Sequence, residues 1–189
     1  MSRYKGLLAA TLLSALPLSG CFKSDFPLLT VFGSVTPVPE GVYTYVDTGK
    51  APKSVVITHD WTVTKMISTK DDGSANIVNL LMDDLGEGFF LVMDPDNNYS
   101  LIHVNPKAIL QFDESTYCDN LLSLARSVGK SIAEYGVVKV LGEKPHVCKF
   151  NDLGSIERAM AALASSRTDT SNGDTVFNLL VISRIYRRS

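Results

Sequence analysis

Cysteine is scarce in this sequence, with three residues in 189, at positions 21, 118 and 148. Small secreted domains that are held together by disulfides carry a much higher density of cysteine, so the sequence excludes a scaffold of that class. Each cysteine must instead be explained by its position. The 45% hydrophobic and 20% charged residues are ordinary for one globular domain of this length.

The sequence also lacks an excess of basic charge, since it has 18 Lys and Arg against 20 Asp and Glu and a formal net charge of −2. Nucleic-acid-binding proteins usually present clustered basic residues, so we expect no nucleic-acid partner. The sequence contains neither a P-loop nor a Gly-x-Gly-x-x-Gly pattern. We therefore predict no nucleotide cofactor, and no other cofactor is indicated.

Long apolar runs are missing, and the longest candidate lies at the start of the chain. Arg3 and Lys5 precede an apolar run over 6–16, which meets Pro17 before it reaches the roughly 20 residues that a membrane-spanning helix needs. A short positive start followed by such a run is typical of a secretory signal peptide. We predict that residues 1–20 form a signal peptide.

The sequence Leu18-Ser19-Gly20-Cys21 ends this segment and resembles the lipobox of bacterial lipoproteins. The resemblance implies cleavage before Cys21 and attachment of acyl chains, such as palmitate, to the new N-terminal residue. The protein would then be held on a membrane by lipid on Cys21. In such lipoproteins aspartate after the cysteine signals retention in the inner membrane. Phe22 stands here, which implies the outer membrane, facing the periplasm.

The region 21–39 contains Pro27, Pro37 and Pro39 and shows no clear hydrophobic period. Such a composition is typical of a linker. We therefore predict that residues 21–39 form a lipidated tether and that a single globular domain spans 40–189.

Short β-branched and aromatic runs separated by turn residues dominate the first half of this domain, which predicts an antiparallel meander. Gly41 and Tyr43 begin a pattern that loosely resembles the meander of small β-barrel binding proteins. We expect strands over 42–46, 54–58, 62–68, 75–82, 88–93, 99–104 and 107–112.

The second half contains two stretches with apolar residues at helical spacing. The first begins near Cys118 and the second follows Asp152, and between them two strands are expected over 135–141 and 146–150. The β-rich run 176–186 predicts a closing strand. The expected fold is α+β: a mainly antiparallel, curved β-meander with two packed α-helices.

Cys118 and Cys148 remain once Cys21 is assigned to lipidation. A disulfide between them suits an oxidising export compartment. The alternative casts one of them as a thiol nucleophile with His146 as its base, because His146 and Cys148 would face the same way on a strand. We predict the disulfide. A zinc site is not indicated, because it needs at least three well-spaced ligands and only His146, Cys148 and the distant Cys118 are available.

No catalytic set can be recognised. His59, Asp60 and His103 belong to no familiar Ser-His-Asp pattern, and the acidic run 94–98 predicts a hairpin turn and not a calcium loop. We therefore predict no catalytic residues and no metal ligands.

The sequence favours a non-catalytic binding or interaction module of the bacterial envelope, whose partner would be an envelope protein or a small ligand. Two alternatives stay open. An envelope hydrolase would need His59, Asp60 or His103 to converge in one pocket. An inhibitor of a cell-wall-attacking enzyme is the other, because small lipidated β-rich proteins include lysozyme inhibitors, although no motif of those inhibitors is present.

Overall fold

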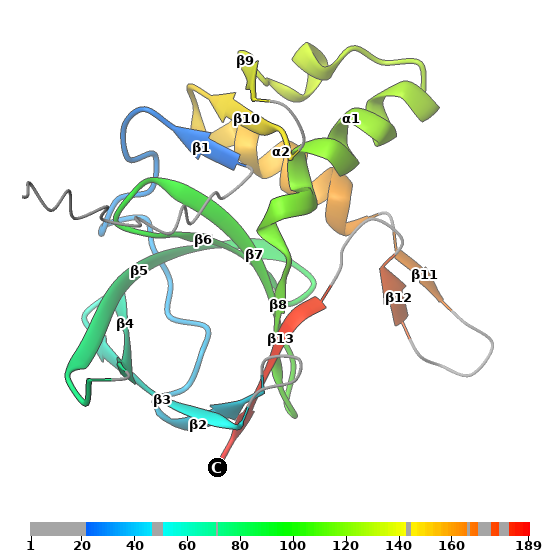
Figure 1. The fold of residues 1–189 in the computed structure, drawn as a ribbon. Helices are drawn as coiled ribbons and strands as arrows, with labels where there is room; N and C mark the ends of the chain where they lie inside the picture. Colours follow the sequence, from blue (N-terminus) through cyan, green and yellow to red (C-terminus); the bar gives the residue numbers. More distant parts are fainter. Residues whose placement is uncertain are drawn as a thin grey trace, which may run out of the picture.

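The computed structural model describes residues 22–46, 51–70, 72–142, 145–165, 167–169, 175–177 and 182–189. Strands account for 45% of it, and eight antiparallel strands close into a barrel with two short helices beside it (Figure 1). The predicted α+β fold is therefore wrong. The protein is mostly β, and its meander is a closed barrel wall and not an open sheet with two packed helices.

The barrel consists of the seven predicted meander strands and one strand from the end of the chain. They are β2 (Gly41–Tyr45), β3 (Lys53–Asp60), β4 (Val63–Thr69), β5 (Ala75–Gly86), β6 (Phe89–Met93), β7 (Asn98–Val104), β8 (Ile109–Phe112) and β13 (Ile182–Arg188). Strand β13 closes the ring, because its first part pairs with β8 and its last two residues pair with β2. Closure leaves these strands without the open sheet edges that promote aggregation.

Strand β5 shows how the wall curves. Its residues 75–80 pair with β4, whereas its residues 81–86 pair with β6. The register shifts between Asp84 and Gly86, where the chain bulges before the turn into β6. Such staggered pairing and bulging bend a sheet toward closure.

The sheet continues beyond the barrel through three further strands. Strand β1 (Phe22–Ser24) pairs with the start of β7 and, in parallel, with β10 (Val147–Phe150), which in turn pairs with β9 (Lys139–Leu141). Phe22 is fully buried and Ser24 is 1% exposed. The residues from Phe22 to Ser24, which the sequence assigned to a tether, thus form a strand of the folded body. The predicted signal peptide and Cys21 lie outside the described residues.

The remainder of the tether region closes one end of the barrel. In Figure 1 the segment between β1 and β2 crosses the ring of strands. The backbone N–H of Val35 donates to the carbonyl of Met82 (2.8 Å), and Val38 is buried in the barrel core. Residues 31–40 thus act as a plug, a name we keep for this segment.

Both predicted helices are present, as α1 (Tyr117–Ser127) and α2 (Leu153–Ala164), with two short 3₁₀ helices, η1 (Glu114–Thr116) and η2 (Ile132–Tyr135). The side chain of Asp152 accepts a hydrogen bond from the N–H of Ser155 (2.8 Å) and caps α2. The helices cover the outer face of the β6–β7 wall, where Leu91 and Leu101 pack with Leu121 and Met160.

The closing strand predicted over 176–186 divides in the structure. Strand β12 (Thr175–Phe177) pairs with β11 (Arg167–Asp169) in a separate two-stranded sheet, and β13 belongs to the barrel. In the described part of the chain, no helix combines the length and hydropathy needed to cross a membrane.

Candidate functional site: the barrel interior

The barrel encloses a cavity of about 320 Å³. This lies at the lower end of the size range of small-molecule sites. Successive residues of a strand point to opposite faces, so every second residue lines the interior. On β4 these are Thr64, Met66 and Ser68, and on β5 they are Asn76, Val78, Leu80 and Met82.

The lining changes character along the barrel. Near the plug it is apolar, with Val38, Ile57 and Met82 among the buried residues. At the other end it includes charged and amide side chains. We call Asp94, Gln111, Glu114 and Arg184 the polar end.

The directions of the strands bring the residues of the polar end close to one another. Antiparallel pairing places the end of β6, the end of β8 and the start of β13 at the same end of the barrel. Asp94 directly follows β6, Glu114 lies two residues after β8, and Arg184 is near the start of β13. Residues separated by up to 90 positions therefore share one end of the cavity.

Hydrogen bonds order these side chains. The Tyr186 hydroxyl donates to Oε1 of Gln111 (2.8 Å), and Nε2 of Gln111 donates to Oε1 of Glu114 (3.3 Å). The guanidinium of Arg184 lies over the ring of Tyr45, 5.2 Å from its centroid. The hydrogen-bond chain from Tyr186 through Gln111 thus ends on the carboxylate of Glu114.

Asp94 has two functions in the structure. Its Oδ1 accepts from the N–H groups of Asp96 (2.8 Å) and Asn98 (2.9 Å), and its Oδ2 accepts from Nδ2 of Asn98 (2.8 Å). These bonds form the turn between β6 and β7, so the predicted hairpin turn is confirmed. Asp94 is also one of the residues that line the cavity.

Burial raises the pKa of Glu114, and the negative charges of Asp94 and Asp113 raise it further. The hydrogen bond from Gln111 and the charge of Arg184 act in the opposite direction but do not cancel the rise. The surroundings of Glu114 therefore favour its uncharged form more than water does, chiefly because the carboxyl group is buried.

The structure contains the disulfide between Cys118 of α1 and Cys148 of β10, with Cα atoms 5.3 Å apart. Both residues are fully buried. Because each sulfur is bonded to the other, neither is available as the thiol nucleophile that the sequence left open.

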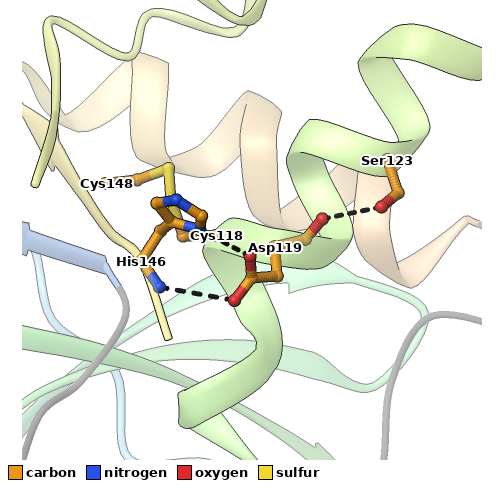
Figure 2. Close-up of polar contacts among 5 residues, drawn as sticks. All are labelled: Cys118, Asp119, Ser123, His146 and Cys148. Atoms are coloured by element: carbon orange, nitrogen blue, oxygen red, sulfur yellow. Dashed lines mark hydrogen bonds and ion pairs between the residues drawn. A yellow bond between two sulfur atoms is a disulfide. The ribbon is translucent and has the colours of Figure 1, made fainter. Parts of the chain in front are cut away.

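A polar pair adjoins the disulfide (Figure 2). Nδ1 of His146 lies 2.6 Å from Oδ1 of Asp119, and the His146 N–H donates to Oδ2 of the same carboxylate (3.3 Å). The hydroxyl of Ser123 donates to the backbone carbonyl of Asp119 (2.9 Å) and not to the imidazole. The two contacts of His146, which directly precedes β10, link this strand to α1. The contact of Ser123 lies within α1 and does not arrange the serine for attack.

The structure does not gather the other candidate residues. On β3, His59 contacts the Val38 carbonyl of the plug through Nε2 (2.7 Å), whereas Asp60 pairs with Lys65 (2.8 Å). On β7, His103 packs against the ring of Phe89. Within the described ranges, no three His, Cys, Asp or Glu side chains are grouped to hold a metal ion.

Comparison with protein-family models, with curated proteins and with solved structures finds no match. Sequence reasoning singled out none of the residues that line the cavity as a ligand-binding group, and it assigned Asp94 to a hairpin turn alone. Period-2 alternation along β4 and β5 was the available signal, but it does not tell which face of each strand points inward.

Proposed function

We propose that this protein is a lipid-anchored envelope protein that binds a small, largely apolar ligand inside its barrel. The cavity carries the proposal, because its volume, its apolar body and its few polar groups at one end match the usual make-up of a small-molecule site. The surrounding wall is continuous through hydrogen-bonded strands, so the site is largely preformed.

The contacts of the candidate catalytic groups support binding over catalysis. The two non-lipobox cysteines form a disulfide, and His59, His103 and His146 lie in three different surroundings. A hydrolase would require such groups to converge on one reacting atom. The polar end of the cavity instead combines carboxylate, amide and guanidinium groups, which orient ligands.

The anchor is proposed from the lipobox. Because Phe22 is buried in β1, lipid on Cys21 would hold the folded domain at the bilayer with no intervening linker. Cys21→Ala should abolish incorporation of labelled fatty acid, whereas Cys118→Ala should retain it. Label entering the Cys21→Ala protein would contradict the anchor and leave the binding proposal in place.

Ligand binding can be tested with a substitution that fills the cavity with a larger side chain. Val78 lines it, whereas its neighbour Ile77 lies on the outer face of β5 with 59% of its surface exposed. In the full-length chain carrying Cys21→Ser, purified without detergent, calorimetry should detect binding of n-decanol. Val78→Trp should weaken this binding at least tenfold and Ile77→Trp should not. Absence of binding to the parent, or equal effects of both tryptophans, would contradict the proposal.

A further inference from the structure

The charged residues of the cavity lining indicate which head group a ligand can carry, an inference that rests on the proposed function. Three charged side chains line the cavity: two carboxylates, Asp94 and Glu114, and one guanidinium, Arg184. The formal charge of the lining is therefore −1. The three charges lie at the end opposite the plug, so a ligand with an apolar tail would place its head group among them.

The hydrogen-bond directions at this end favour a ligand that donates. Gln111 donates to Glu114, Asn98 donates to Asp94, and Asn76 donates through Nδ2 to the hydroxyl of Ser68 (3.5 Å). Each lining amide thus gives a hydrogen bond to a neighbouring group of the wall. The carboxylates of Glu114 and Asp94 receive two of these three bonds. Carboxylates are also the strongest acceptors that the cavity presents.

Arg184 is the group that would favour an anionic head. Its guanidinium lies over the ring of Tyr45, and Tyr45 in turn packs against Tyr186, with ring centroids 5.0 Å apart. This stacking holds the cation against the wall. One stacked guanidinium does not outweigh two carboxylates, so the excess charge at the polar end is negative.

The surroundings of Glu114 also favour a cationic head group. Its half-buried carboxylate receives one long hydrogen bond from Gln111, and burial together with Asp94 raises its pKa. A cation placed beside Glu114 would stabilise its ionised form and relieve the repulsion from Asp94. An anion at the same place would destabilise the ionised form of Glu114 further and would add to the repulsion from Asp94.

We propose that the barrel binds an amphiphile with a cationic head, an alkylammonium compound, whose ammonium group contacts Glu114 and Asp94 while its chain fills the apolar interior toward Val38. Charge-assisted hydrogen bonds from an ammonium to carboxylates in a partly desolvated site are among the stronger polar contacts available to a ligand.

Three probes that share a ten-carbon alkyl chain distinguish a cationic, a neutral and an anionic head group. They are n-decylamine, which is protonated at pH 7, n-decanol and n-decanoate. Calorimetry on the full-length Cys21→Ser chain should give an affinity for decylammonium at least tenfold above that for decanol, with decanoate the weakest. Decanol binding with no preference for decylammonium, or tighter binding of decanoate, would overturn the inference but not the proposed function. Failure of all three to bind would overturn both.

Variants test the contact itself. Glu114→Gln should lower the affinity for decylammonium about tenfold and leave that for decanol unchanged. Glu157→Gln is the matched control, since Glu157 is also a partly buried glutamate with a raised pKa but lies on α2, away from the cavity lining. An equal loss in both variants, or an unchanged decylammonium affinity in Glu114→Gln, would refute the assignment. The probe series on the parent protein keeps the test valid if a variant fails to fold.

Discussion

Cys118 and Cys148 join the first helix to the strand that flanks the barrel, and their disulfide is fully buried. The bond closes a loop whose ends are 30 residues apart. In the chain-entropy model such a loop stabilises the folded state by about 3–4 kcal/mol. Cys118→Ser should therefore lower the free energy of unfolding by about that amount, measured by urea denaturation.

The double variant Cys118→Ser with Cys148→Ser is the control for a lone buried thiol. It should lose a similar free energy, because the crosslink is absent in both proteins. A double variant as stable as the parent would show that the disulfide contributes nothing to the fold.

The pair formed by His146 and Asp119 should stabilise the same junction. Asp119→Asn keeps the shape of the side chain and removes its charge, so the two bonds to His146 become weaker. Because both side chains are only 27% and 28% exposed, we expect a loss of about 0.5–1.5 kcal/mol, the usual net contribution of a hydrogen bond, in urea denaturation at pH 6.

Asp60→Asn provides the comparison. Asp60 pairs with Lys65 at 2.8 Å, but its side chain is 70% exposed. Solvent screens exposed pairs, so this variant should unfold within error of the parent. A loss in Asp60→Asn equal to that in Asp119→Asn would show that partial burial of the His146 pair has no energetic consequence.

Glu157 of α2 predicts a pH dependence. Burial raises its pKa above the ordinary 4.5, and a hydrogen bond and the charge of Asp83 on β5 raise it further. The fold thus favours the protonated form. Its stabilising contribution is fully present below pH 4.5 and is lost as the pH rises through the folded-state pKa. Glu157→Gln should raise the Tm at pH 7 and change it less at pH 4.

Asp152, which caps the same helix, has a pKa shift of the opposite sign. Hydrogen bonds from the side chain and backbone of Ser155 hold its pKa below the usual range. Its contribution is present above the unfolded-state pKa and is lost as the pH falls through the folded-state value. Asp152→Ala should therefore lower the Tm at pH 7, with a smaller effect in strong acid. Parallel pH profiles for the two variants would contradict both assignments.

The individual elements of this fold could be predicted from local patterns. Turn residues and short β-rich runs identify β2 to β8, and helical spacing of Leu121 and Ala125 identifies α1. The disulfide also followed from counting cysteines. These signals act over a few residues, which is the range in which sequence alone is informative.

Closure of the barrel could not be predicted in this way. It depends on β13, where Arg188 pairs with Tyr43 and Ile185 pairs with Leu110. These pairings join segments far apart in the chain, and no local period specifies them. An open curved sheet and a closed barrel have the same alternation along each strand.

The cavity could not be predicted from the sequence for a related reason. On β5, Val78 faces inward and Ile77 faces solvent, although both are apolar and β-branched. Hydrophobicity therefore did not distinguish the two faces. In the predicted tether, prolines suggested a linker, whereas Leu29 and Val38 are buried without any periodic pattern.

The attachment of this N-terminal segment gives the last prediction. The hydroxyl of the fully buried Tyr99 accepts a hydrogen bond from the N–H of Leu28 (2.9 Å) and lies 3.1 Å from the hydroxyl of Ser24. Tyr99→Phe keeps the ring in the core but leaves the Leu28 N–H without this acceptor. Because this donor is only partly buried, the loss of its partner should cost about 1 kcal/mol, at the lower end of the penalty for a buried donor.

We therefore expect Tyr99→Phe to lose stability of that order and to speed hydrogen exchange in residues 24–30 before the barrel strands are affected. Tyr186→Phe is the control, because its hydroxyl donates to the side chain of Gln111 on the barrel wall. It should leave exchange at Leu28 unchanged. Because the plug follows this segment in the chain, its protection should fall next as the attachment loosens. Unaltered exchange over 24–30 in Tyr99→Phe would mean that strand pairing of β1 alone holds the segment, and that the tyrosine hydroxyl is dispensable for it.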